Sequence, residues 1–240
     1  MNKLLTADLT RIFKEKSLYY GLFFSSLLAL LFVFVNKSEN DFIAIPDSSP
    51  LMILPFFTGA VIALNIATEF TSGAIRNKLI MGHGRIKIIF SWAICFMLVT
   101  LLFFVFYEIC AFSFAYLMGY DLSFLEASLV IKNLLLICLL LLSNVFFVIL
   151  VCVIIEDNRS VAVMFLLQFS LMFVSSIGAE ALCDNKTAQF LFRFFPQGQL
   201  TVLSVVKSPD RPWLTIICCV SAGIIMLTSS LIYFRKHDMK

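Results

Sequence analysis

Six long apolar runs divide the chain, and short polar stretches separate them. A helix needs about 20 apolar residues, rising 1.5 Å each, to cross about 30 Å of hydrocarbon. The second run is short and contains Pro55 and Gly59, which predicts a kink or an adapted helix end. The pattern predicts an all-α polytopic membrane protein with six transmembrane helices in a single domain, residues 1–240. The runs cover residues 18–35, 51–67, 86–117, 134–155, 161–182 and 213–234.

Composition supports the same class of protein. The 240 residues are 61% hydrophobic and 14% charged, whereas soluble domains are about 45–50% apolar and about 25% charged. This excludes a soluble enzyme, a disordered chain and a collagen-like chain. Seven Cys residues without a C-x-x-C pair are expected to be small reduced hydrophobes, and with only His83 and His237 we expect no metal site.

The distribution of positive charge predicts the orientation. With a cytoplasmic N-terminus, about 12 of the 18 Lys and Arg residues lie on the cytoplasmic side, as the positive-inside rule requires. Six spans then leave both termini in the cytoplasm. The net charge of +3 is too small to indicate a nucleic-acid partner.

Two segments beside the spans have an amphipathic or apolar character. In residues 1–17, helical spacing of Leu5, Leu9, Ile12 and Phe13 predicts an interfacial helix on the inner leaflet, with membrane lipid as its partner. Residues 183–212, between the fifth and sixth spans, are too apolar for a solvated loop and too short to span. We expect re-entrant or interfacial outer helices there, and a short outer loop at residues 118–130.

Residues 68–85 connect the second and third spans on the cytoplasmic side. The pattern predicts a short helix with one apolar face, basic side chains elsewhere, an acidic residue near its start and a glycine stop. A rigid helix here could transmit a movement of a cytoplasmic partner to the second and third spans. A basic connector that only satisfies the positive-inside rule is about equally compatible with the spacing. The residues concerned are Ile75, Leu79 and Ile80 (apolar face), Arg76 and Lys78 (elsewhere), Glu69 (start) and Gly82 (stop).

The chain lacks the motifs of several enzyme classes. It contains no G-x-x-x-x-G-K-[ST] phosphate loop, no H-E-x-x-H and no G-x-S-x-G. We therefore expect a transport or scaffold subunit that is not itself an ATPase, binds no cofactor and has no catalytic residues.

The cytoplasmic connector resembles the loop between the second and third spans of ABC-2 type permeases, the membrane subunits of a class of ABC transporters. Gly84 replaces the Ser usual before the final Arg, and His83 is not typical, which bears on details of the partner contact. The ordered layout of the whole chain adds to the resemblance, as does Phe194-Phe195-Pro196, which resembles the family's Pro-containing outer element. The matching residues are Glu69, Gly73, Ile75, Arg76, Leu79, Gly82 and Arg85.

The resemblance implies a mechanism and partners. Two six-span subunits, identical or paralogous, would pair in a bacterial plasma membrane. Each would dock a cytoplasmic ABC ATPase that holds ATP and Mg, with the segment from Glu69 to Gly82 as the coupling helix. The pair would move a peptide or an amphipathic or lipidic substrate outward. Small members of this kind resemble bacteriocin or lantibiotic export and immunity permeases.

Four polar residues inside the apolar runs are candidates for a substrate path. Asn144 and Gln168 are expected deep in the membrane, where hydrogen bonding between helices is favoured over a role in translocation. Glu108 and Glu180 each follow the start of their span by about 31 Å along the helix. There, solvation among headgroups is favoured over an outer vestibule that attracts a cationic substrate.

Three other functions remain open. The main alternative is a membrane scaffold that binds a peptide, for example in immunity, without transport; it would need no coupling helix and recruit no ATPase. An intramembrane enzyme is disfavoured because no paired His or deep acidic pair is present. An ion channel is disfavoured because no repeated pore loop or charged ring is visible.

Overall fold

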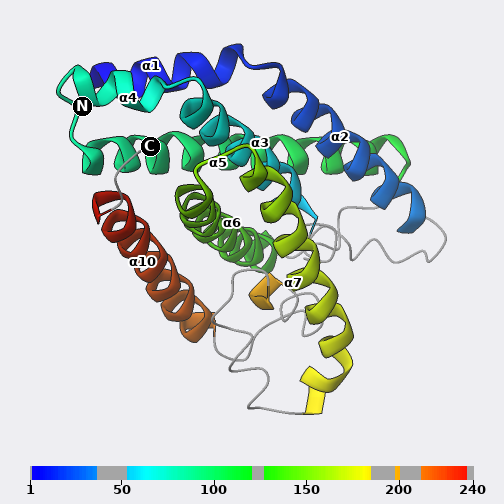
Figure 1. Cartoon of the computed structure of the whole chain (residues 1–240). Helices are drawn as coiled ribbons and strands as arrows, with labels where there is room; N and C mark the ends of the chain where they lie inside the picture. The colour runs from blue at the N-terminus through cyan, green and yellow to red at the C-terminus, as the bar shows by residue number, and fades with distance from the viewer. Residues whose placement is uncertain (1, 37–52, 121–126, 185–197, 201–211, 237–240) are drawn as a thin grey trace.

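The computed structural model describes residues 2–36, 53–120, 127–184, 198–200 and 212–236 (Figure 1). The regular structure of these residues is entirely helical. The helices are α1 (Asn2–Lys14), α2 (Lys16–Asn36), α3 (Leu54–Thr71), α4 (Ala74–Ile80), α5 (Arg85–Leu117), α6 (Ala127–Ile155), α7 (Arg159–Asp184) and α10 (Pro212–Lys236).

Five of these helices, namely α2, α3, α5, α6 and α10, are long and apolar enough to cross a membrane. In α7, the part whose side chains the structure describes, Arg159–Val174, is apolar but shorter than a full span. The structure thus agrees with the all-α, multi-span membrane fold expected from the sequence.

Helix bounds follow the apolar runs to within two residues, except in α3, which is shifted by three to four residues, and in α6. Helix α5 starts one residue before the predicted run and ends with it at Leu117. Helix α6 begins at Ala127, seven residues before the predicted start, and so takes in part of the predicted outer loop. Lys132 and Asn133 set the predicted start of the apolar run at residue 134, but both residues are compatible with a helix that extends past the hydrocarbon.

The predicted outer segment, residues 183–212, lies largely outside the described residues. Its first two residues end α7, and Pro212 starts α10. Between them, residues 198–200 are helical, with Gln199 and Leu200 buried. Leu200 belongs to a core cluster with Leu54 of α3 and Leu140 of α6, so this short stretch packs among the spans.

The helices pack into one bundle whose main core is rich in branched and aromatic side chains. Helix α6 packs along α10, α2 along α5, and α3 against both α6 and α7. The main core cluster includes Ile62, Trp92, Phe96 and Ile149, drawn from α3, α5 and α6. Helix α1 lies across one end of the bundle, against the first turns of α5 (Figure 1).

Both ends of the described chain lie at that same end of the bundle (Figure 1). The Nη1 of Arg85, at the start of α5, donates to the carbonyl oxygens of Phe234 and Arg235 at 3.0 Å each. These carbonyls belong to the last turn of α10, where backbone acceptors lack partners within the helix and a cation suits the helix dipole. Arg85 therefore fastens the end of α10 to the start of α5.

Candidate functional site

The connection from α3 to α4 is made by a left-handed glycine. Gly73 has a φ of 70°, and its N–H donates to the Phe70 carbonyl at 3.3 Å. A Cβ at this position would meet nothing within 4 Å. The backbone conformation, not crowding, is therefore what favours glycine here.

Helix α4 ends at the glycine predicted to stop it. Gly82 has a φ of 83°. Its N–H donates to the Leu79 carbonyl at 2.9 Å, while the His83 N–H donates to the Lys78 carbonyl at 3.1 Å. This pair of bonds is a Schellman motif, which satisfies the last carbonyls of the helix. Two glycines thus delimit a helix of seven residues.

The predicted faces of α4 are only partly correct. Ile75 is buried and Leu79 packs against the core as expected. Ile80, predicted on the same face, is 77% exposed. Lys78, predicted to project elsewhere, is buried beside Ile75, because residues three apart share a face of a helix.

Glu69 lies in the last turn of α3, which corrects the prediction that it begins the short helix. A carboxylate at a helix C-terminus is disfavoured by the helix dipole, and this one is fully buried. It is compensated by an ion pair with Nη2 of Arg11 at 2.5 Å and another with Nζ of Lys78 at 2.7 Å. The indole N–H of Trp92 also donates to its Oε2 at 3.1 Å.

A second carboxylate extends this arrangement to the N-terminal helix. Nζ of Lys78 donates to Oδ1 of Asp8 at 2.7 Å, and the Ser91 hydroxyl donates to Oδ2 of Asp8 at 2.7 Å. Two carboxylates thus face two cations, and their charges balance. We call the set the ionic cluster. Its members, from α1, α3, α4 and α5, are Asp8, Arg11, Glu69, Lys78, Ser91 and Trp92.

The ionic cluster makes α4 part of a rigid unit. Removing one partner of a buried ion pair costs about 3–5 kcal/mol, because the other charge is left without compensation. Lys78 contacts carboxylates from both α1 and α3. A displacement of α4 alone would separate these charges, so α4 is expected to move together with α1, α3 and α5.

The opposite side of α4 faces outward. Arg76 is exposed, Ile80 is 77% exposed and Met81 is 68% exposed. We call these three residues the α4 patch. It lies at the end of the bundle that also carries the described chain ends (Figure 1). The residues predicted from the sequence therefore form two groups. Glu69, Ile75 and Leu79 face the interior of the bundle, whereas Arg76 belongs to the exposed α4 patch.

The two deep amides contact each other. Nε2 of Gln168 in α7 donates to Oδ1 of Asn144 in α6 at 3.3 Å, and both side chains are buried. Gly59 of α3 lies against Gln168, because a Cβ there would be 3.0 Å from the Nε2 of Gln168. This geometry supports hydrogen bonding between helices as their role.

The two acidic path candidates have different outcomes. Glu108 is only 8% exposed in α5, which disagrees with the favoured expectation that it is solvated among headgroups. Its Oε1 has no hydrogen-bond partner among the described residues. Glu180 lies in α7, but its side chain falls outside the part that the structure describes.

The sequence reading missed the contribution of α1 to the site. Asp8 lies between Leu4 and Ile12 at a spacing of four, so all three share one helix face. Leu4 and Ile12 are buried, and Asp8 is buried with them. A single acidic residue within an apolar stripe was the available signal, since burial requires a charged partner.

Among the residues that the structure describes, no group of three or more His, Cys, Asp or Glu side chains is placed to hold a metal ion. No protein-family model matches the sequence, and no curated protein is significantly similar to it.

Proposed function

We propose that this chain is the membrane-spanning permease subunit of an ATP-driven ABC exporter of the ABC-2 type. It would cross a bacterial plasma membrane six times, with both termini in the cytoplasm. A separate ABC ATPase subunit would supply the energy from ATP and Mg, and a second permease copy or paralogue would complete the path. The substrate would be a peptide or an amphipathic or lipidic molecule moved outward.

One observation carries the proposal: a short helix between two membrane helices is fixed from inside by buried charges and presents an apolar and basic surface outside. Lys78 joins α4 to α1 and α3, while Ile80 and Met81 are exposed at the same end of the bundle. Large exposed apolar groups outside the membrane favour a protein contact. The α4 patch is therefore the proposed seat of the ATPase.

The ionic cluster gives this contact a mechanical consequence. When two ATPase subunits close on ATP, the α4 patch would move with them. The contacts of Lys78 with Asp8 and Glu69, and of Asp8 with Ser91, would carry that movement into α1, α3 and α5. Glu69 thus acts within the permease and not at the ATPase surface. Gly73 and Gly82 define the two ends of α4, the helix that transmits the movement.

The test is recovery of the partner from native membranes. The tagged chain is purified in mild detergent, and co-purifying proteins are identified by mass spectrometry. We expect an ATPase that carries a phosphate-loop sequence. The double variant Ile80→Asp, Met81→Asp places charges in the α4 patch and should lower its recovery about tenfold, a loss of about 1.4 kcal/mol of binding free energy.

A matched control uses the far end of α5. Tyr116 and Leu117 are 75% and 78% exposed there, and the double variant Tyr116→Asp, Leu117→Asp should keep the ATPase. Equal recovery with the α4 patch variant would contradict the coupling role of α4. If no ATPase is recovered with the unaltered chain, a peptide-binding or immunity scaffold becomes the better hypothesis.

A further inference from the structure

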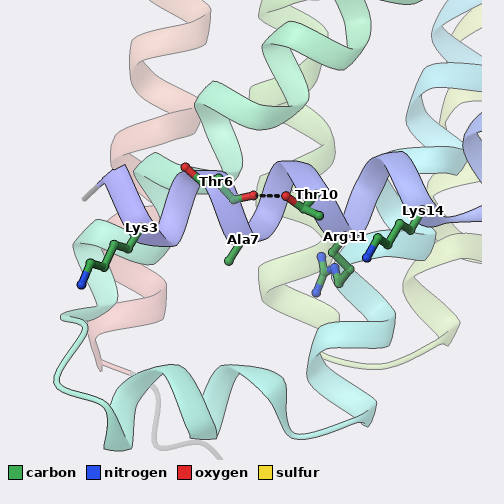
Figure 2. A pocket seen from close by; sticks show the side chains of 6 residues that line it. All are labelled: Lys3, Thr6, Ala7, Thr10, Arg11 and Lys14. Carbon is green, nitrogen blue, oxygen red and sulfur yellow. Dashed lines mark hydrogen bonds between the residues drawn. The ribbon is translucent and has the colours of Figure 1, made fainter.

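Helix α1 carries a cationic strip on its outer face. The strip lines a hollow on the surface, and Figure 2 shows its cationic side chains spread along the helix. Its members recur at spacings of three and four residues, which places them on one side of the helix. They are Lys3, Thr6, Ala7, Thr10, Arg11 and Lys14.

The strip has an excess of positive charge. Arg11 at its edge is paired with Glu69, and Asp8 lies on the buried face with Lys78. The ionic cluster is therefore neutral as a whole. Lys3 and Lys14 remain exposed and are not balanced by an acidic residue of α1. Glu15, next to Lys14, is offset by Lys16, so the surface keeps an excess of positive charge, which favours an anionic ligand.

The position of the strip indicates where that anion comes from. Helix α1 ends at Lys14, and the membrane-crossing helix α2 begins at Lys16. The Lys14 end of the strip therefore adjoins the start of a span, and Lys3 lies about 17 Å along α1 from it. Helix α1 lies across the end of the bundle (Figure 1) with its apolar face packed on α5, so the strip is turned away from the bundle.

Aromatic residues beside the strip suit the same environment. Phe13, predicted on the apolar face of α1, is instead 45% exposed. It lies three and seven residues after Thr10 and Thr6, on the flank of the strip. Tyr19 and Tyr20 in the first turns of α2 are exposed as well, and the Tyr19 hydroxyl donates to the Phe13 carbonyl oxygen at 2.9 Å. Exposed aromatic rings with polar ends are typical of the membrane–water interface.

We infer that this strip binds the phosphate headgroups of acidic phospholipids in the inner leaflet, with Lys3 and Lys14 as the main cations. Phe13 and Tyr20 would contact the adjoining acyl region. Attraction of this kind is worth about fivefold in affinity for each Lys or Arg near an acidic membrane surface. The inference concerns lipid and does not depend on the transport function proposed above.

The experiment measures retention of phosphatidylglycerol. The purified chain is reconstituted in phosphatidylcholine bilayers that contain a minor share of phosphatidylglycerol, and the lipid retained by the protein is measured by native mass spectrometry. We expect selective retention of phosphatidylglycerol. The double variant Lys3→Gln, Lys14→Gln should weaken it about 20- to 30-fold. Because both lysines are exposed, its thermal unfolding should equal that of the unaltered chain.

The control removes an exposed lysine in the first turns of α6, in Lys132→Gln, and should retain the lipid. Equal retention by the strip variant and the unaltered chain would overturn the inference. Displacement of the lipid by an equal concentration of glycerol phosphate would also overturn it, since that result indicates a site for soluble phosphate.

Discussion

Lys78 is the residue on which the end of the bundle depends most. Its ammonium group is shared by Asp8 and Glu69 at 2.7 Å each, and it lies 6.0 Å from the Trp92 ring centre. We expect Lys78→Met to lower the free energy of unfolding by about 3–5 kcal/mol, since two buried carboxylates lose their common cation. Thermal unfolding in detergent measures this. Lys87→Met, on an exposed lysine, should leave it unchanged, and an equal midpoint for both variants would refute the assignment.

The pairing around Lys78 shows where sequence reasoning stops at the level of single residues. The sequence identified Glu69 as important and placed Asn144 and Gln168 deep in the membrane, and the latter two contact each other. It did not pair Lys78 with Asp8, because these two residues lie on different helices and are 70 positions apart in the chain. Periodicity reports which face a residue occupies, but not which helix lies opposite.

At the scale of elements, α4 depends on the conformation of its two glycines. Gly73→Ala should destabilise the chain by about 1–2 kcal/mol, because a residue with a Cβ disfavours a φ of 70°. Gly84→Ala is the matched control: Gly84 has a φ of −66°, and a Cβ there meets nothing within 4 Å. Equilibrium unfolding compares the two. A loss of equal size in both would show that the left-handed turn is not the cause.

Elements were predictable where a run of apolar residues or a glycine in the sequence determines their bounds. Helix α5 agrees with its apolar run to one residue, and Gly82 ends α4 as expected. The start of α6 was wrong because Lys132 limits the hydrocarbon-compatible length without ending a helix. The place of α4 was right, but its buried face was not, since Ile80 is more apolar than Lys78 and yet is the exposed one. A buried counter-charge outweighed hydropathy there.

At the scale of the whole molecule, two contacts indicate whether the chain crosses the membrane an even or an odd number of times. Ser91 bonds Asp8 of α1, and Arg85 bonds the end of α10. Both chain ends therefore adjoin the start of α5. Five crossings would leave the ends on opposite sides of a membrane, so we expect α7 to supply the sixth.

Epitope insertion in the full chain measures this parity. An epitope after Asn158 and one after Asp184 flank α7 and should be reached by antibody from opposite sides of the membrane. Epitopes at the two termini, as controls, should be reached from the same side as the one after Asn158. Access to both α7 sites from one side would rule out the sixth crossing.

The wide sequence separation within the ionic cluster has a consequence for biogenesis. Lys78 follows Asp8 by 70 positions in the chain, and Ser91 follows it by 83. While the first two spans insert, Asp8 has neither partner and its charge must remain hydrated. Helix α1 can therefore dock only after the first turns of α5 have been made. Docking of α1 then requires that α3, α4 and the start of α5 have already assembled.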